Sequence, residues 1–209
     1  ASMPKSCMRL TTAGLASART TAPGLEVTDW ESGTSPKVNG IALELKAFEG
    51  SRSLAIPAKP TTFVLGTDWY LRGFDRNGKQ IWQQSVPGAV WAVNISKDGR
   101  WIVAAFGDGT IRWHRAEDGV EQMAFYPHPD QRRWVLWTPS GYYDSSAGAE
   151  DLIGWHVNNG KDRASDYFSA SRFRDRFYRP DVLSRLLDTA SETEAVKLAN
   201  AETGRREQS

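Results

Sequence analysis

The feature that most constrains the fold is a hairpin pattern that recurs about every 40 residues along the chain. Residues 101–114 read as an apolar strand, a Gly-Asp-Gly-Thr turn and a second strand with alternating polarity. Residues 62–75 match this pattern, and Arg72 and Arg112 lie 40 positions apart. Because one short β unit cannot bury both of its faces alone, such repetition indicates units that stack on one another.

A third copy follows downstream. The run from Trp113 to His114 reappears as Trp155 and His156, 42 residues later. A period of about 40–45 residues with four short strands per unit is typical of WD40-type β-propellers. We therefore expect an all-β fold of about three to four WD40-type blades in a partial ring, in which tryptophans near residues 69, 113 and 155 seal blade against blade. An open meander or sandwich with coincidental spacing is the alternative.

The pattern divides the chain into three parts. Residues 1–23 show no period and are rich in Thr, Ala, Ser and Gly, so we expect a poorly ordered N-terminus. The predicted blades occupy residues 24–160. Residues 161–209 form a helical C-terminal extension, because apolar residues there take helical spacing, Pro180 suits a first helical position, and Ser191 begins a capping box.

The predicted blade count is low, since propellers usually have about 4–8 blades. Terminal blades with uncovered faces and edges would meet water, which sheets seldom tolerate. The sequence therefore predicts a homo-oligomer that completes the ring, or a fragment of a longer chain.

The composition of the chain limits the classes of partner and the cellular compartment that we expect. A net charge of +1 gives no overall attraction for nucleic acid or an anionic membrane, and no apolar run reaches the roughly 18 residues of a membrane span. Cys7 is the single cysteine, which rules out an intramolecular disulfide and fits a reducing compartment. We expect a cytoplasmic protein that binds neither nucleic acid nor membrane.

Two segments carry a family resemblance. One runs from Arg133-Trp-Val-Leu-Trp through Thr-Pro-Ser-Gly-Tyr-Tyr-Asp144 to Gly160, and the other from Asp166 to Leu183. Together they resemble the last blade and exit helix of bacterial WD40-repeat proteins, which often continue into a caspase-like peptidase domain. The resemblance covers roughly residues 60–190 and implies a binding or scaffolding propeller beside an enzyme. The caspase-like domain is absent, and its His and Cys match no residue here.

Two histidines and a serine are the candidates for catalysis. His114 and His156 hold equivalent strand positions and could flank a shared metal or catalytic site, or each could be a strand residue beside a core Trp. Ser140, His156 and Asp144 could form a Ser-His-Asp arrangement, although turn chemistry also explains Ser140.

Acidic residues gather in the C-terminal third of the chain. They are Asp144, Glu150, Asp151, Asp162 and Asp166. Calcium prefers six to eight oxygen ligands from such loops, so Asp144 and Asp151 are candidate calcium ligands, although solvated loop acids are the alternative. Arginines interleaved with aromatic residues at 172–179 could bind single-stranded nucleic acid, but the spacing of the aromatic residues suits helix packing better.

Three functions are compatible with these patterns. The first is a non-catalytic WD40-like module without a cofactor, which binds a protein or peptide through the aromatics Trp69, Tyr142 and Tyr143, expected to be exposed. The second is a small metal-dependent hydrolase of the lactonase or esterase kind, with a site at the propeller centre near His114 and His156. The third is a purely structural assembly module. We favour the first.

Overall fold

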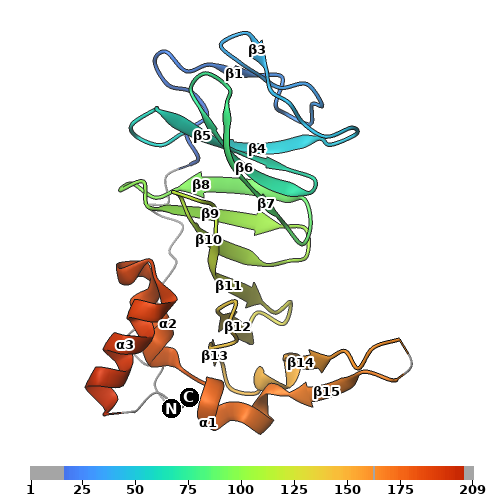
Figure 1. Cartoon of the computed structure of the whole chain (residues 1–209), viewed down its shortest axis with the longest axis vertical. Coiled ribbons are helices and arrows are strands. Elements are labelled where there is room, and N and C mark those ends of the chain that lie inside the picture. The colour runs from blue at the N-terminus through green and yellow to red at the C-terminus, as the bar shows by residue number, and fades with distance from the viewer. Residues whose placement is uncertain (1–16, 162, 205–209) are drawn as a thin grey trace.

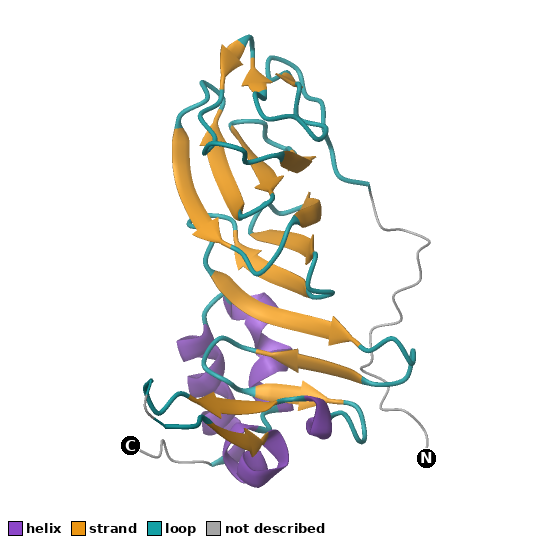
Figure 2. Ribbon diagram, turned by 90° about the vertical axis from the view of Figure 1, so that its right-hand side faces the viewer, coloured by secondary structure: helices purple, strands orange, loops and turns teal. Residues whose placement is uncertain are grey.

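The computed structural model describes residues 17–161 and 163–204 (Figure 1). The chain is mostly β, with several antiparallel sheets followed by a few C-terminal helices. The sheets follow one another along the long axis, and the helices lie at the end opposite the first sheet (Figures 1 and 2). None of the described helices is long and apolar enough to cross a membrane.

A small three-stranded sheet begins the fold. Its strands are β1 (Val27–Thr28), β2 (Lys37–Val38) and β3 (Ile41–Ala42). The β2–β3 hairpin turns at Asn39 and Gly40, with φ of 49° and 80°, as a tight Asn-Gly hairpin requires. The Asn39 side chain also accepts a hydrogen bond from the Glu26 N–H at 2.9 Å, which ties the hairpin to β1.

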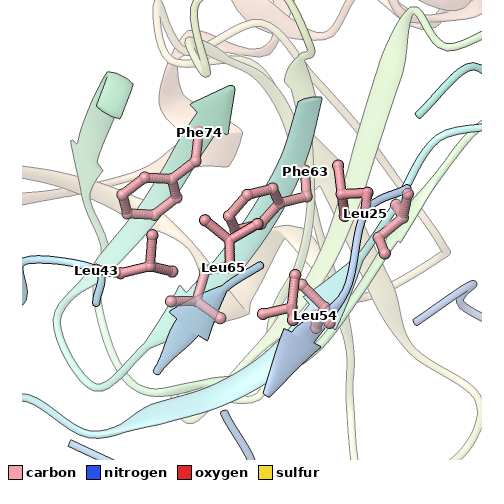
Figure 3. Close-up of a cluster of buried hydrophobic side chains, with 9 residues drawn as sticks. Leu25, Leu43, Leu54, Phe63, Leu65 and Phe74 are labelled. Atoms are coloured by element: carbon pink, nitrogen blue, oxygen red, sulfur yellow. The ribbon is translucent and has the colours of Figure 1, made fainter. Parts of the chain in front are cut away.

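The first repeat forms a four-stranded antiparallel sheet. Its strands, in spatial order, are β4 (Ser51–Ala55), β5 (Thr62–Thr67), β6 (Tyr70–Asp75) and β7 (Gln80–Ser85). One face packs against the small sheet, where Leu25 and Leu43 meet Leu54, Phe63 and Phe74 (Figure 3). The Phe63 and Phe74 rings stack with centroids 5.2 Å apart. The small sheet thus covers one end of the stack.

The second repeat and part of the third share one six-stranded sheet. Its strands are β8 (Val90–Ile95), β9 (Trp101–Phe106), β10 (Ile111–Arg115), β11 (Glu121–Pro127), β12 (Trp134–Trp137) and β13 (Tyr143–Ser145). The sequence predicted that the third repeat would form a blade of its own. That prediction is wrong, because β12 pairs directly with β11.

The β11–β12 turn explains this difference. The Asp130 carboxylate accepts hydrogen bonds from the backbone N–H groups of Arg132 and Arg133, each at 2.9 Å, and the His128 N–H donates to the Arg133 carbonyl at 2.9 Å. The chain therefore doubles back tightly beside β11 instead of crossing to start another sheet. No closed ring of blades forms in the described part of the chain.

The rest of the third repeat is a separate hairpin followed by helices. The elements are η1 (Glu150–Leu152), β14 (Gly154–Val157), β15 (Asp166–Ser169), η2 (Ala170–Phe173), α1 (Arg174–Phe177), α2 (Pro180–Thr189) and α3 (Glu192–Thr203). Strand β15 lies inside the range expected to be helical, so the helices begin only at Ala170. Trp155 packs on Phe173 and Phe177, with ring centroids 5.3 and 4.8 Å away, and does not lie between two sheets.

The two large sheets pack closely where β4 meets β8. The Ser53 hydroxyl donates to the Val90 carbonyl at 2.8 Å, and a Cβ on Gly66 would collide with both residues. Buried Val64, Leu71 and other apolar residues fill the space between the sheets. The absence of a side chain at Gly66 therefore permits this approach.

Helices α2 and α3 cover the other face of the six-stranded sheet. Leu183 and Leu186 of α2 and Ala195 of α3 are buried against Met123 of β11. Both ends of the stack are therefore covered in the described structure. The sequence predicted self-association because the terminal faces were expected to be bare. Since both faces are covered, that expectation is not met.

The N-terminal end of the described chain lies beside the β4–β5 connection. The Arg19 carbonyl accepts a hydrogen bond from the Ile56 N–H at 2.7 Å, and Ala22 bridges to Leu25. Part of the stretch expected to be poorly ordered is thus described and bonded to the sheet. Residues 1–16, including Cys7, lie outside the described residues.

Candidate binding rim

One edge of the stacked sheets gathers four loops that we call the loop rim. It comprises residues 46–50, 68–69, 87–89 and 107–110, together with Trp91 at the start of β8, which lies beside Gly107. The first and third segments precede β4 and β8, and the other two connect β5 to β6 and β9 to β10. The Gly107 N–H donates to the Ala89 carbonyl at 2.9 Å, which joins two of these loops.

Phe48 projects from the first rim loop and is 91% exposed. Its φ of 66° is in the left-handed region, which is strained for a residue with a bulky side chain. The turn is closed by a hydrogen bond from the Glu49 N–H to the Lys46 carbonyl at 3.0 Å. Packing within the chain does not explain why a phenyl ring is held outward on a strained, closed turn.

The Glu49 side chain fixes this turn from below. It is fully buried and accepts hydrogen bonds from Arg72 Nε at 2.9 Å, Arg72 Nη2 at 2.6 Å and the Lys46 N–H at 2.9 Å, with a further bond from the Thr67 hydroxyl. Burial alone would raise the pKa of Glu49, but these hydrogen bonds outweigh burial and hold the pKa below its ordinary value. The rim therefore rests on a buried, paired carboxylate.

Two tryptophans flank a second ion pair on the rim. The Asp68 carboxylate accepts hydrogen bonds from Arg52 Nε at 2.6 Å and the Gly50 N–H at 2.9 Å. The Arg52 bond is the main reason that the pKa of Asp68 is lowered. Trp69, next in the chain, is 45% exposed, and Arg52 stacks on Trp91, which is 60% exposed, at 5.6 Å from the ring centroid. The Arg–Asp pair thus contacts the Trp91 ring directly and fixes the loop residue that precedes Trp69.

The second repeat holds its rim loop in a related way. The Asp108 carboxylate accepts hydrogen bonds from the Thr110 N–H at 2.9 Å, the Thr110 hydroxyl at 2.6 Å and Arg112 Nη2 at 2.9 Å. Arg112 also pairs with Glu121 at 2.8 Å. Burial raises the pKa of Asp108, but the bonds from Thr110 and Arg112 outweigh it and lower the pKa. Fixed carboxylates therefore brace the rim in both sheets.

The three predicted aromatic contacts differ in their surroundings. Trp69 lies on the rim and is exposed, as described above. Tyr142 is half-buried, with its ring 6.2 Å from Phe177. Tyr143 is only 1% exposed and its ring lies 5.6 Å from Tyr178, so the expectation that it is exposed was wrong. The cause is the return of the chain at Tyr178, which forms a bridge with Tyr143.

The structure does not bring His114 and His156 together. His114 is buried on β10, with Nδ1 2.9 Å from the Gly119 carbonyl oxygen and Nε2 without a hydrogen-bond partner among the described residues. Burial lowers the pKa of His114. His156 is exposed on β14, which lies far from β10 along the molecule (Figure 1). The shared site suggested by their equivalent positions is therefore not formed, because the third repeat does not make a blade.

Ser140 and Asp144 also have separate partners. The Ser140 hydroxyl bonds to Glu192 and lies 3.1 Å from the Thr138 hydroxyl, with no bond to His156. The Asp144 carboxylate accepts the Ser145 N–H at 2.8 Å and bonds to Tyr178, while burial raises its pKa. The predicted Ser-His-Asp arrangement is not assembled.

The candidate calcium ligands are likewise dispersed. Asp151 is exposed, Glu150 pairs with Arg174, and Asp166 accepts a hydrogen bond from Asn159 at 2.9 Å. Asp162 lies outside the described residues. Within residues 17–161 and 163–204, no group of three or more His, Cys, Asp or Glu side chains could hold a metal ion.

Sequence reasoning missed two of the three rim aromatics. Trp91 lies on a strand of alternating polarity, and the pattern alone does not tell which face meets solvent. Phe48 directly follows an alternating apolar run at residues 41–47, and its exposure comes from the turn at Glu49. The available signal was Gly50, whose missing Cβ leaves room for Asp68 and Arg52.

Comparison with solved structures shows a likeness in fold, whereas comparison by sequence finds no match. No protein-family model matches the sequence, and no curated protein matches it either. Among solved structures, the chain is similar to the crystal structure of BamB from Moraxella catarrhalis, with 17% sequence identity and a TM-score of 0.41. The match covers 62% of this chain and 46% of the BamB chain, so this chain spans about half the length of that protein.

Proposed function

We propose that this chain is a non-catalytic binding module whose loop rim takes up a protein or peptide partner. The observation that carries the proposal is the exposure of three aromatic side chains beside buried or half-buried ion pairs: Phe48 and Trp69 on rim loops, and Trp91 at the start of β8. A few residues carry most of the binding energy of a protein interface, and aromatic side chains, tryptophan above all, are enriched at such surfaces. Loops that are fixed before binding lose little conformational entropy when a partner arrives.

We also infer that the units β4–β7 and β8–β11 act as propeller-type blades. Their 40-residue spacing and close packing at Ser53 and Val90 support this inference. The WD40 type and the caspase-like neighbour are further proposals that rest on the family resemblance. The homo-oligomer is a proposal that rests on the low blade number alone, since both ends of the stack are covered. In a propeller, loops at one edge of successive blades form a continuous rim, which is the surface proposed here.

A comparative capture experiment tests the rim. The whole chain and the variant Phe48→Ala/Trp69→Ala/Trp91→Ala are immobilised, and proteins retained from a bacterial lysate are quantified by mass spectrometry. Because removal of one interface anchor costs about 1–2 kcal/mol, we expect affinity for a specific partner to fall at least tenfold.

The matched control is Ile81→Ala/Tyr167→Ala, which removes exposed apolar side chains from β7 and β15. It should retain the same partner as the wild type. Equal retention by the rim variant and the wild type would contradict the proposal. So would a hydrolytic turnover that depends on none of the three rim aromatics.

A further inference from the structure

A cleft of about 750 Å³ lies where the β8–β9 turn approaches the C-terminal end of α2. In Figure 1 this turn and α2 lie on the same side of the molecule. The apolar walls are Trp101, Val103, Trp113 and Leu187. The rim uses none of these residues, so the cleft is a separate surface.

The two walls of the cleft are bonded to each other. The Trp101 indole N–H donates to the Leu187 carbonyl at 3.1 Å, and Arg100 Nη1 donates to the Asp188 carbonyl at 3.2 Å. Both carbonyls belong to the last turn of α2, where helix carbonyls lack partners within the helix. These hydrogen bonds fix the two walls relative to each other, so a ligand would find the cleft already formed.

Three polar groups that border the cleft are unused. The Trp113 indole N–H makes no hydrogen bond with the described residues, although its ring packs beside the helices. The side chains of Lys97 and Asp188, one from each wall, form no ion pair with the described part of the chain. The cleft thus offers a donor, a cation and an anion around an apolar floor.

We propose that this cleft binds a linear peptide segment of a partner protein, with a large apolar side chain between an acidic and a basic residue. The apolar side chain would lie on Trp113 and Val103, and a peptide carbonyl would accept the Trp113 indole N–H. The acidic residue would face Lys97 and the basic residue Asp188.

The balance of charge favours a peptide over nucleic acid. Lys97 and Arg100 are matched by Asp98 and Asp188 among the residues that line the cleft. A nucleic-acid surface carries an excess of cations, because it must neutralise phosphates. An apolar cleft with a few convergent polar groups is the usual form of a ligand site.

Selection from a displayed library of short random peptides tests the proposal on the whole chain. Wild-type protein should enrich peptides in which an acid and a base flank an apolar residue, always in the same order along the peptide. The variant Lys97→Glu/Asp188→Lys should enrich the reverse order of charges. Absence of enrichment, or enrichment of the same peptides by both proteins, would overturn the proposal, as would occupation of the cleft by a second copy of the chain in solution.

The indole N–H signals of the protein, observed by NMR with an enriched peptide, separate this surface from the rim. The Trp113 signal, assigned with Trp113→Phe, should move on binding, whereas the signals of Trp69 and Trp91 should not. Trp113→Phe keeps an aromatic floor and removes the donor, so affinity should fall about threefold to tenfold. A shift only at Trp69 and Trp91 would overturn the cleft and leave the rim proposal standing. A shift at Trp113 without a shift at Trp69 or Trp91 would support the cleft proposal. The rim proposal is decided separately by the capture experiment.

Discussion

Arg72 and Arg112 occupy equivalent positions in the two repeats but differ in burial. The Arg72 side chain is 3% exposed and pairs with fully buried Glu49, whereas the Arg112 side chain is 16% exposed and pairs with Asp108 and Glu121. Removal of one partner from a fully buried ion pair leaves an uncompensated charge, which is more costly than the loss of a partly exposed pair that water can reach. The same residue type at the same repeat position should therefore contribute very differently to stability.

Arg72→Met should lower the free energy of unfolding by about 3–5 kcal/mol, measured by urea denaturation. Arg112→Met is the matched control and should cost about 1 kcal/mol. Because the pKa of Glu49 is lowered in the folded state, the stability from Glu49 is present above its unfolded pKa and is lost as pH falls through the folded pKa. Equal losses in the two variants would show that burial does not distinguish the pairs.

His114 should make stability depend on pH. Its folded-state pKa is lowered, first by burial and then by the charge of Arg112, although the Gly119 carbonyl and Glu121 act in the opposite direction. The unfolded chain therefore binds a proton that the folded chain does not, once pH falls below about 6.5. Stability from neutral His114 is present above that pH and is lost as pH falls toward the lowered pKa.

This pH dependence is measurable as the melting temperature between about pH 7.5 and 5, below which other groups titrate. His114→Gln should flatten the decline, and His156→Gln, which alters an exposed histidine, should leave it unchanged. An identical decline in wild type and His114→Gln would assign it to other groups.

At the scale of elements, local patterns predicted hairpins better than they predicted sheets. Residues 101–114 form the expected hairpin, with Ile111 paired to Ala105 across β9 and β10. The sequence could not predict that β12 joins the sheet of β8–β11, because this pairing depends on how Asp130 closes the preceding turn. Pairing between strands is decided by such contacts, while the apolar alternation of each strand is the same in either arrangement.

For the candidate site too, sequence reasoning was limited by contacts between distant segments, which it could not predict. The exposure of Trp69 was predicted, but Trp69 was also expected to seal one blade against the next, and a side chain that is 45% exposed does not do so. Tyr143 was wrongly expected at the surface, since the chain returns at Tyr178 to cover it. Contacts between segments so far apart in sequence leave no signal in the composition of either segment.

At the scale of the whole molecule, the ends of the stack are closed by unlike caps. The three-stranded sheet covers β4–β7, and helices α2 and α3 cover the sheet of β8–β13. Repeat arrays need terminal elements with a polar outer face, because each internal face is apolar. In this chain the helices occupy the place where another blade would stack.

Opening the helical cap should convert the chain into a self-associating species. Leu186 is fully buried among Met123, Val182 and Ala195, so Leu186→Asp places a carboxylate in an apolar site and should release α2 and α3. The exposed face of the six-stranded sheet would then bind a second copy, seen as a higher mass by light scattering and as binding of a hydrophobic dye. Ser184→Asp adds the same charge at an exposed position of the same helix and should keep the mass and dye binding of the wild type. If Leu186→Asp stays at the wild-type mass with its helical circular dichroism intact, the helices do not serve as the cap that keeps this face from a further sheet.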